Sequence, residues 1–406
     1  MKSIENQCHT AHVREYLLVG LLGLASFTYV LGVMQFSPLL TSISTEFSVS
    51  ESTVGQLTAI GGIVGTVTAL AAAPWMQRYS RRRWLSMQFG LLVIAILVMA
   101  IAPTFSVLVT GRVIAGLAGG AVLANCFTAA GELVVDLRRR NRGIAVVASG
   151  TTLAILAGLP SLTLINDRLD WRWASASIAV PAFLVLAGVQ WLPDRRPDQI
   201  SESGRLSGIR SVLGQSRARW LVVVNGLMFL AYIGWITYVG AYIENDFASG
   251  ARQLGLLFLV GGICELVANV VAPALFRRFS VFALSLFGAI GMSITLLGSG
   301  IVFSSIAALF VAISLLHVFT SFLYIGSQTL LIDVDQEQRG TVMALGSAAS
   351  GLGGASGAFV AGLALASLGS YETTYRLLGA VMVLSVVCLI FSQRAQVQAT
   401  ISSRRL

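Results

Sequence analysis

Two ionisable residues, Arg112 and Glu265, stand in otherwise apolar stretches of the sequence. An ionised group at the centre of a membrane costs roughly 2.5–3.5 kcal/mol on insertion scales, so it usually faces a cavity or a partner. A carboxyl group that leaves water holds its proton more tightly, which would allow Glu265 to load and release protons. Arg112 could share in that chemistry or bind a carboxylate. The structural alternative is that Arg112 caps helix backbones and that Glu265 is a neutral, hydrogen-bonded residue between helices.

A stripe of polar residues between positions 317 and 328 could serve the same chemistry. Its members recur at steps of three and four residues, which places them on one side of a helix. They are His317, Ser321, Tyr324 and Gln328. His317 is a candidate proton relay, and the alternative is a histidine held in the packing by a hydrogen bond.

Other amide, hydroxyl and aromatic side chains in the apolar stretches are candidates for the wall of a substrate cavity. They are Tyr29, Gln35, Gln56, Asn125, Asn225, Tyr232, Trp235 and Asn269. A wall with hydrogen-bonding groups and few fixed charges favours a neutral or cationic small organic molecule over a polyanion.

The elements that carry these residues are membrane-spanning helices. Hydrophobic residues make up 56% of the 406 positions and charged residues 11%, a balance that excludes an ordinary soluble domain. Apolar runs of roughly 20 residues can each cross the membrane as a helix, whereas a transmembrane barrel would need short alternating segments. About twelve runs occur, near 16–40, 52–75, 84–102, 105–132, 143–165, 174–192, 218–241, 252–276, 281–301, 304–331, 340–368 and 372–393.

The chain repeats itself at a spacing of 200 residues. Glu46-Phe47 returns as Asp246-Phe247, and Gly61-Gly62-Ile63 returns as Gly261-Gly262-Ile263. Such a repeat of apolar segments is typical of a secondary transporter built from two copies. We therefore expect an all-α membrane protein with two six-helix bundles, at 1–192 and 218–406, joined by a linker at 193–217. Gly65 becomes Glu265 in the second copy, so only one bundle carries this carboxyl group.

Arginines concentrate in alternate loops and in the linker, which predicts that both termini are cytoplasmic. This placement explains the net charge of +9 without a nucleic-acid surface. The first residues are too polar, and the run that follows is too long, for a cleaved signal peptide. The four cysteines show no paired spacing, so we expect no disulfide and no metal site. We also expect no cofactor, no phosphate-binding loop and a monomer in the lipid bilayer.

Several segments resemble the major facilitator superfamily. The loop 73–82 resembles the signature GxxxDRxGRR, the segment 111–120 resembles the arginine-containing motif of the drug/proton antiporter branch, and Gly150 to Gly158 with Pro160 is similar to that branch's glycine-proline motif. Asp170-Trp171-Arg172-Trp173 matches a run that often follows. Within the branch, the chain is similar to the bacterial sugar, arabinose and purine efflux subgroup, and this resemblance implies the bacterial inner membrane.

The chain departs from the loop signature at its carboxylate position, which is Gln77. In relatives that carboxylate is thought to hold a cytoplasmic latch, so here the latch would be weak or supplied by Glu132 or Asp136. The loop cations that such a latch would use are Arg78, Arg81 and Arg82. The helix 5 motif also lacks its following glycine pair.

The expected function is proton-coupled efflux of a small organic molecule, such as a drug, sugar or nucleoside-like compound, by alternating access. A proton-coupled symporter that imports a metabolite is the alternative, and a non-transporting membrane receptor is a third possibility. Enzymatic activity has no support, because no cluster of nucleophile, base and metal ligands emerges from the sequence.

Overall fold

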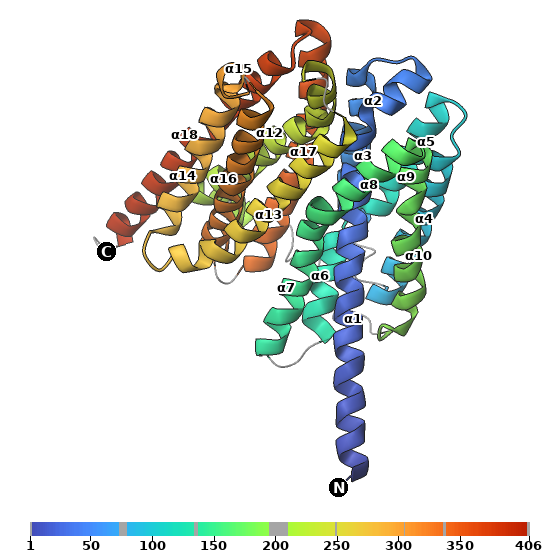
Figure 1. Cartoon of the computed structure of the whole chain (residues 1–406). Helices are drawn as coiled ribbons and strands as arrows, with labels where there is room; N and C mark the ends of the chain where they lie inside the picture. Colours follow the sequence, from blue (N-terminus) through green and yellow to red (C-terminus); the bar gives the residue numbers. More distant parts are fainter. Residues whose placement is uncertain are drawn as a thin grey trace. The chain divides into compact units, whose positions relative to one another are not determined.

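The computed structural model describes residues 2–72, 79–133, 137–194, 210–247, 250–303, 305–335 and 338–403 (Figure 1). These residues form helices and contain no strand, as the sequence predicts. Eleven segments among them are long and apolar enough to cross a membrane, and the shorter apolar helix Val281–Leu297 adds a twelfth candidate. The prediction of an all-α membrane protein with about twelve spans is confirmed.

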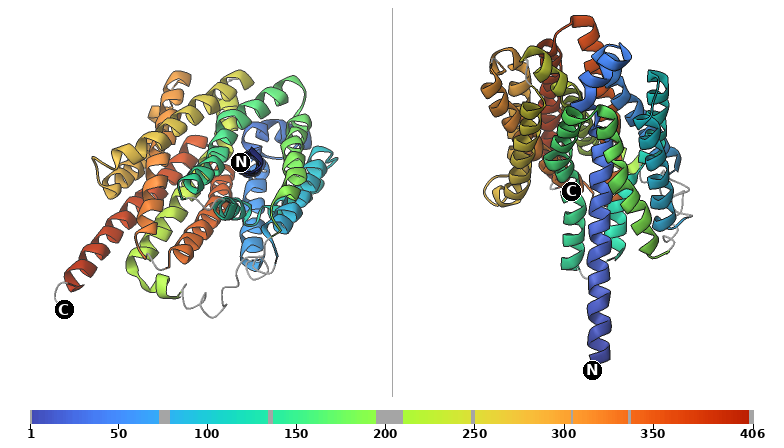
Figure 2. Two further views of the ribbon diagram at one scale, coloured as in Figure 1. Left: turned by 90° about the horizontal axis from the view of Figure 1, so that it is seen from below. Right: turned by 45° about the vertical axis from the view of Figure 1, so that its right-hand side comes forward.

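In the first half of the sequence, four of the described spans consist of more than one helix. The helices are α1 (Lys2–Met34), α2 (Phe36–Phe47), α3 (Glu51–Ala72), α4 (Arg81–Ala100), α5 (Phe105–Gly119), α6 (Val122–Leu133), α7 (Leu137–Leu153), α8 (Leu159–Arg168), α9 (Trp171–Ser177) and α10 (Ala179–Gly188). Short π-helical and 3-10 turns add η2 (Ala154–Gly158) and η3 (Val189–Trp191). The first turns of α1 extend beyond the other helices of their unit (Figure 2).

The second half contains longer uninterrupted helices. They are α12 (Ser216–Asp246), α13 (Ala251–Leu275), α14 (Val281–Leu297), α15 (Ser299–Val302), α16 (Ile306–Ile332), α17 (Arg339–Leu368) and α18 (Tyr371–Ser403). α12 packs against α17 and α18, and α16 packs against both α13 and α14 (Figure 1). The α13–α16 contact positions the residues described below.

The repeat is visible in how corresponding helices begin. Ser80 precedes α4, and its hydroxyl accepts a hydrogen bond from the backbone N–H of Arg83 at 3.4 Å. Ser280, 200 positions later, precedes α14 and accepts from the N–H of Ala283 at 3.1 Å. A serine at this position satisfies one of the free N–H groups of a first turn, so both copies start this helix in the same way.

The helices group into two compact units that do not follow the midpoint of the sequence. Unit 1 comprises Met1–Leu39 and Val64–Gln199, and unit 2 comprises Leu40–Ile63 and Ile200–Leu406. The sequence analysis placed all of 1–192 in one bundle. The difference arises because the first half of α3 packs with helices from the second half of the sequence.

Candidate functional site

The carboxyl group that breaks the repeat has a specific partner. Oε2 of Glu265 on α13 lies 3.0 Å from Nδ1 of His317 on α16. The His317 side chain is fully buried, and the Glu265 side chain is 18% exposed. Two ionisable groups that the sequence named separately therefore form one hydrogen-bonded pair within unit 2.

A glycine makes room for this pair. Gly261 lies one turn before Glu265 on α13, and a Cβ at this position would lie 2.7 Å from Cδ2 and 2.8 Å from Nε2 of His317. Real Cβ atoms do not approach other atoms so closely, so the histidine ring can occupy this place only beside a glycine.

Aromatic rings of α12 surround the histidine. The ring centroids of Tyr232 and Trp235 lie 6.0 and 5.7 Å from that of His317, and 6.2 Å from each other. Ser321 lies one turn after His317 on α16 and is buried. The structure thus brings together five predicted site residues from three helices.

The remaining predicted residues of unit 2 lie along the same helices with different surroundings. Nδ2 of Asn225 donates to the Gly346 carbonyl at 2.8 Å and to the Ser350 hydroxyl at 2.7 Å. Tyr324 is 40% exposed and packs edge-on against Phe229. The side-chain oxygens of Asn269 and Gln328 are buried and accept no hydrogen bond from the described residues.

Gln56 belongs to the part of α3 that packs within unit 2. Its Nε2 donates to the Phe359 carbonyl of α17 at 3.2 Å. Next to it, Tyr238 of α12 lies against Gly55 and Gly362. The amide of Gln56 thus links α3 to the backbone of α17.

Arg112 belongs to unit 1 and caps a helix end. Its Nη1 donates to the Gly32 carbonyl at 2.9 Å and its Nη2 to the Val33 carbonyl at 3.2 Å. These are carbonyls of the last turn of α1, where four C=O groups have no partner within the helix. The guanidinium also stacks over the Phe36 ring, 4.9 Å from its centroid. Backbone carbonyls and an aromatic ring thus hold the guanidinium in this structure.

Two further unit 1 candidates surround the same helix end. Gln35, between α1 and α2, donates to the Gly32 carbonyl at 2.9 Å and accepts from the Ser175 hydroxyl at 3.0 Å. The Tyr29 ring lies against Gly119 of α5, where a Cβ would come within 2.8 Å of it. Both side chains take part in packing α1 onto its neighbours.

The start of α4 is tied to α6 by Arg81. Its Nε lies 3.5 Å from Oε1 of Glu132, and its Nη1 donates to Oδ1 of Asn125 at 3.3 Å. Arg82 donates to Oε1 of Gln190 at 3.3 Å. Glu132 therefore stands opposite a cation of the signature loop, whereas Gln77, Arg78 and Asp136 lie outside the described residues.

The helix 5 motif combines close packing with a change of helix type. A Cβ on Gly150 would overlap the Gly23 carbonyl oxygen, and one on Gly158 would lie 2.7 Å from a methyl group of Leu31. Pro160 lies in the first turn of α8, directly after the π-helical turn η2. Proline lacks an N–H group and π-turns insert one residue, so this motif interrupts the helix.

Sequence reasoning missed three polar residues that join helices. Tyr371 at the start of α18 donates to Oε2 of Glu51 at the start of α3, and Nδ2 of Asn245 near the end of α12 donates to Oε1 of the same carboxylate at 2.8 Å. All three lie at span ends, where polar residues are normal. No sequence signal set them apart.

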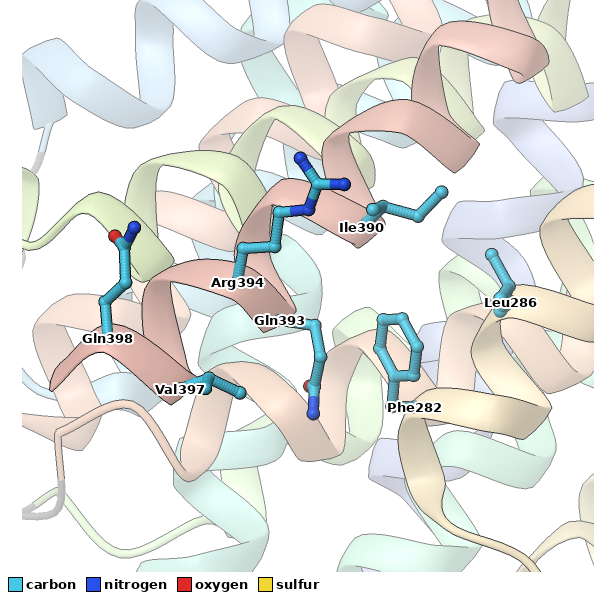
Figure 3. Close-up of a pocket in the computed structure, with 7 residues that line it drawn as sticks. All are labelled: Phe282, Leu286, Ile390, Gln393, Arg394, Val397 and Gln398. Atoms are coloured by element: carbon cyan, nitrogen blue, oxygen red, sulfur yellow. The ribbon is translucent and has the colours of Figure 1, made fainter. Parts of the chain in front are cut away.

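A groove of about 410 Å³ lies between the start of α14 and the last turns of α18. Figure 3 shows its lining, which includes Phe282, Leu286, Ile390 and Arg394. None of the predicted site residues lines it. Its lining residues belong to α14 and α18, whereas Glu265 and His317 belong to α13 and α16.

The sequence matches a known family. The family model of the Major Facilitator Superfamily matches residues 22–300 and 240–406. Crystal structures share the fold: the nucleoside transporter NupG superimposes with a TM-score of 0.75 at 12% identity, covering 93% of this chain and 99% of that one. A POT family transporter in complex with 5-aminolevulinic acid gives a TM-score of 0.75 at 13% identity, covering 93% and 96%.

Curated relatives include efflux proteins. The uncharacterized MFS-type transporter YwfA of Bacillus subtilis (strain 168) is 25% identical over 400 residues, which cover 96% of this chain and 95% of that protein. The chloramphenicol efflux pump Rv0191 of Mycobacterium tuberculosis (strain ATCC 25618 / H37Rv) is 29% identical over 258 residues, covering 62% and 60%. A probable sugar efflux transporter of Mannheimia succiniciproducens is 24% identical over 269 residues, covering 65% and 66%.

Proposed function

The chain belongs to the major facilitator superfamily, and we propose that it exports a small uncharged organic molecule across the bacterial inner membrane in exchange for protons. Transport of small molecules by a multi-pass membrane protein follows from family membership. The direction of transport, the coupling to protons and the substrate class are the parts that we propose.

The observation that carries the proposal is the contact of Glu265 with His317 at 3.0 Å. A buried carboxyl–imidazole pair can hold or lack one extra proton, because both groups can bind and release one. No equivalent carboxyl group stands at Gly65 in the first copy of the repeat. We assign proton binding to this pair and a structural role to Arg112, whose guanidinium binds backbone carbonyls.

Two relatives motivate export of an uncharged substrate. Their names refer to chloramphenicol efflux and to sugar efflux, and both kinds of compound are uncharged and carry hydroxyl groups. The contacts of Arg112 agree with this, because its guanidinium donates to two backbone carbonyls and an anionic substrate would need a positive charge to balance it.

Alternating access would expose the pair and the substrate to one side of the membrane at a time. In this proposal the protein acts as a monomer with both termini in the cytoplasm, and the two bundles at 1–192 and 218–406 move about the linker at 193–217. Labelling of a single cysteine at either terminus in intact cells and in inverted vesicles tests the orientation.

The central experiment uses inside-out vesicles with an acidified lumen and a pH-sensitive dye. Addition of chloramphenicol, a neutral hexose or a nucleoside is expected to release protons from the lumen for at least one compound. Glu265→Gln is expected to reduce this release at least tenfold, since an amide binds no proton in this range. The matched control is Glu372→Gln, which removes a surface carboxylate paired with Arg376 at 3.7 Å.

Two results would contradict the proposal. Proton release that persists in Glu265→Gln would remove the carboxyl group from the coupling mechanism. Uptake of substrate together with protons into right-side-out vesicles would favour the importing symporter instead.

A further inference from the structure

Four polar atoms around the Glu265–His317 pair have no hydrogen-bond partner among the described residues. They are the Tyr232 hydroxyl, Trp235 Nε1, His317 Nε2 and Ser321 Oγ. The four side chains are at most 6% exposed, and three of their rings are mutual neighbours at centroid distances of 5.7 to 6.2 Å. Buried polar groups are nearly always paired, so a cluster of unpaired ones indicates a place where a ligand supplies the partners.

The hydrogen-bonding role of Nε2 of His317 depends on how many protons the pair holds. Without an extra proton, Nδ1–H donates to the Glu265 carboxylate, and Nε2 carries a lone pair that accepts hydrogen bonds. An extra proton has two possible sites. If it sits on the imidazole, Nε2 carries hydrogen; if it sits on Glu265, the carboxyl O–H donates to Nδ1 and the ring hydrogen again resides on Nε2. In both arrangements Nε2 changes from acceptor to donor.

Within the described helices that pack against α16, the pair is the only charged group away from the helix ends. The helices packed against α16 are α12, α13, α14, α15 and α17. Apart from Glu265, their charged residues lie in first or last turns, at Arg217, Arg219, Glu244, Asp246, Arg252 and Arg339. The other titratable side chains of these helices and of α16 itself are uncharged: Tyr232, Tyr238, Tyr242, Cys264 and Tyr324.

The chemistry of the four groups defines the ligand. Trp235 Nε1 can only donate, the Tyr232 and Ser321 hydroxyls can donate or accept, and the rings offer apolar faces. A hydroxyl group that accepts from Trp235 can donate its own hydrogen to Nε2 of His317. An anion would need a positive charge that these four groups do not provide while the pair lacks the extra proton. The Glu265 carboxylate already accepts from Nδ1–H of His317, so its charge is balanced within the pair.

We propose that Tyr232, Trp235 and Ser321 bind an uncharged, hydroxyl-bearing ligand, and that Nε2 of His317 couples this binding to the proton on the Glu265–His317 pair. This inference rests on the proposed proton-coupled export and specifies its site. A ligand hydroxyl donates to Nε2 while the pair lacks the extra proton. Arrival of the proton places a hydrogen on Nε2, so the ligand loses its acceptor and dissociates more readily. Proton and ligand thus weaken each other's binding through Nε2 of His317.

Binding to the purified full-length protein tests this exchange directly. The probes are chloramphenicol, its 3-O-acetyl ester, a neutral hexose and a nucleoside, measured by thermal stabilisation and radioligand binding between about pH 5 and pH 9. For at least one hydroxyl-bearing probe, the Kd is expected to rise roughly threefold to tenfold as the pH falls, the effect of losing one hydrogen bond. If chloramphenicol binds through its primary hydroxyl, the ester binds more weakly and its Kd changes less with pH.

Variants separate the role of Nε2 from general packing. His317→Asn keeps an amide near Nδ1 but has no group at Nε2, so weak binding with a flat pH profile is expected. His317→Gln keeps an amide that can donate or accept near Nε2, so it should bind at all pH values with a flat profile. Trp235→Phe should weaken binding at every pH and keep the slope. The control Ser314→Ala removes a hydroxyl that bonds the Phe310 carbonyl within α16 at 2.7 Å, and it should bind as the unchanged protein does.

A pH slope that persists in both His317 variants would overturn the inference, as would failure of every probe to bind. Such a result together with loss of proton release in Glu265→Gln would leave the proposed function intact. Conversely, the Kd could depend on pH as expected while vesicles show no proton movement. That result would refute the proposed function but would still support the ligand site.

Discussion

At the scale of single residues, the site depends on small groups as much as on ionisable ones. Glu265 attracts attention in the sequence because a carboxyl group in an apolar helix is costly. Its contact with His317 is possible only because Gly261 leaves space for the imidazole ring. Arg112 is equally prominent in the sequence, but its guanidinium donates hydrogen bonds to two backbone carbonyls of α1.

Gly261→Ala should therefore disturb the pair. The new Cβ would lie 2.7 Å from Cδ2 of His317, and relieving such overlap in a packed interior typically costs about 1–3 kcal/mol. We expect the ring to move from Glu265 and proton-coupled transport to fall roughly tenfold. Vesicle transport and the melting temperature measure the two effects. Gly90→Ala on α4, where nothing lies within 4 Å of the added Cβ, is the control.

Arg112→Lys should act on stability and leave coupling unchanged. Lysine keeps the positive charge but cannot bond two carbonyls with a planar fork, so the free energy of unfolding should fall by about 1–3 kcal/mol. Denaturation in detergent measures this loss, and the ratio of protons to substrate measures coupling. A changed ratio without a loss of stability would give Arg112 a role in proton transfer.

At the scale of elements, the two halves repeat a close helix contact. A Cβ on Gly150 of α7 would overlap the Gly23 carbonyl of α1, and a Cβ on Gly353 of α17 would overlap the Gly226 carbonyl of α12. Both residues of the second contact follow those of the first by 203 positions. In membranes, where helices gain no hydrophobic energy by associating, small residues permit the backbone approach that stabilises the pair.

Gly150→Ala and Gly353→Ala are expected to destabilise the protein to a similar degree, about 2 kcal/mol each, because a backbone carbonyl cannot move aside as a side chain can. Melting temperatures in detergent provide the measurement. Gly131→Ala, whose Cβ would meet nothing within 4 Å, should leave stability unchanged or raise it, because alanine favours helix over glycine. Equal stability of all three variants would refute the importance of these contacts.

At the scale of the whole molecule, the first half of α3 belongs with the second half of the sequence. Glu51 accepts hydrogen bonds from Asn245 and Tyr371, and Gln56 donates to the Phe359 carbonyl. Further along, Gly62 lies against Ala355 of α17. Alternating access requires helices from different halves of a transporter to separate at one side of the membrane, so these contacts are candidates for a gate that opens.

A cross-link between α3 and α17 tests this role. A Cβ on Gly62 would lie 2.8 Å from Cβ of Ala355, slightly closer than the roughly 3.8 Å of a disulfide, so a small shift would accommodate one. In a background without the native cysteines, Gly62→Cys with Ala355→Cys should lose at least nine tenths of transport on oxidation and regain it with a reductant. Each single variant should be insensitive to oxidation. Full transport by the cross-linked protein would exclude movement at this contact.

The sequence by itself determined the class of the protein, its spans, its internal repeat and the residues worth attention. These properties follow from the lipid environment, which demands long apolar helices and makes each polar interruption conspicuous. For the same reason Arg112, Glu265 and His317 could be named without a structure. The contacts that join Glu51, Asn245 and Tyr371 at the span ends could not be predicted.

Only the tertiary structure decided which residues meet. In the structure, Glu265 contacts His317 and Arg112 donates to backbone carbonyls. Residues 40–63 belong to the compact unit that contains the second half of the sequence. The physical reason is that a helix apolar on all sides gives little indication of which face points to a neighbour. Its rotation and its partners are set by the fit of small residues and backbones between helices, and that fit exists only in three dimensions.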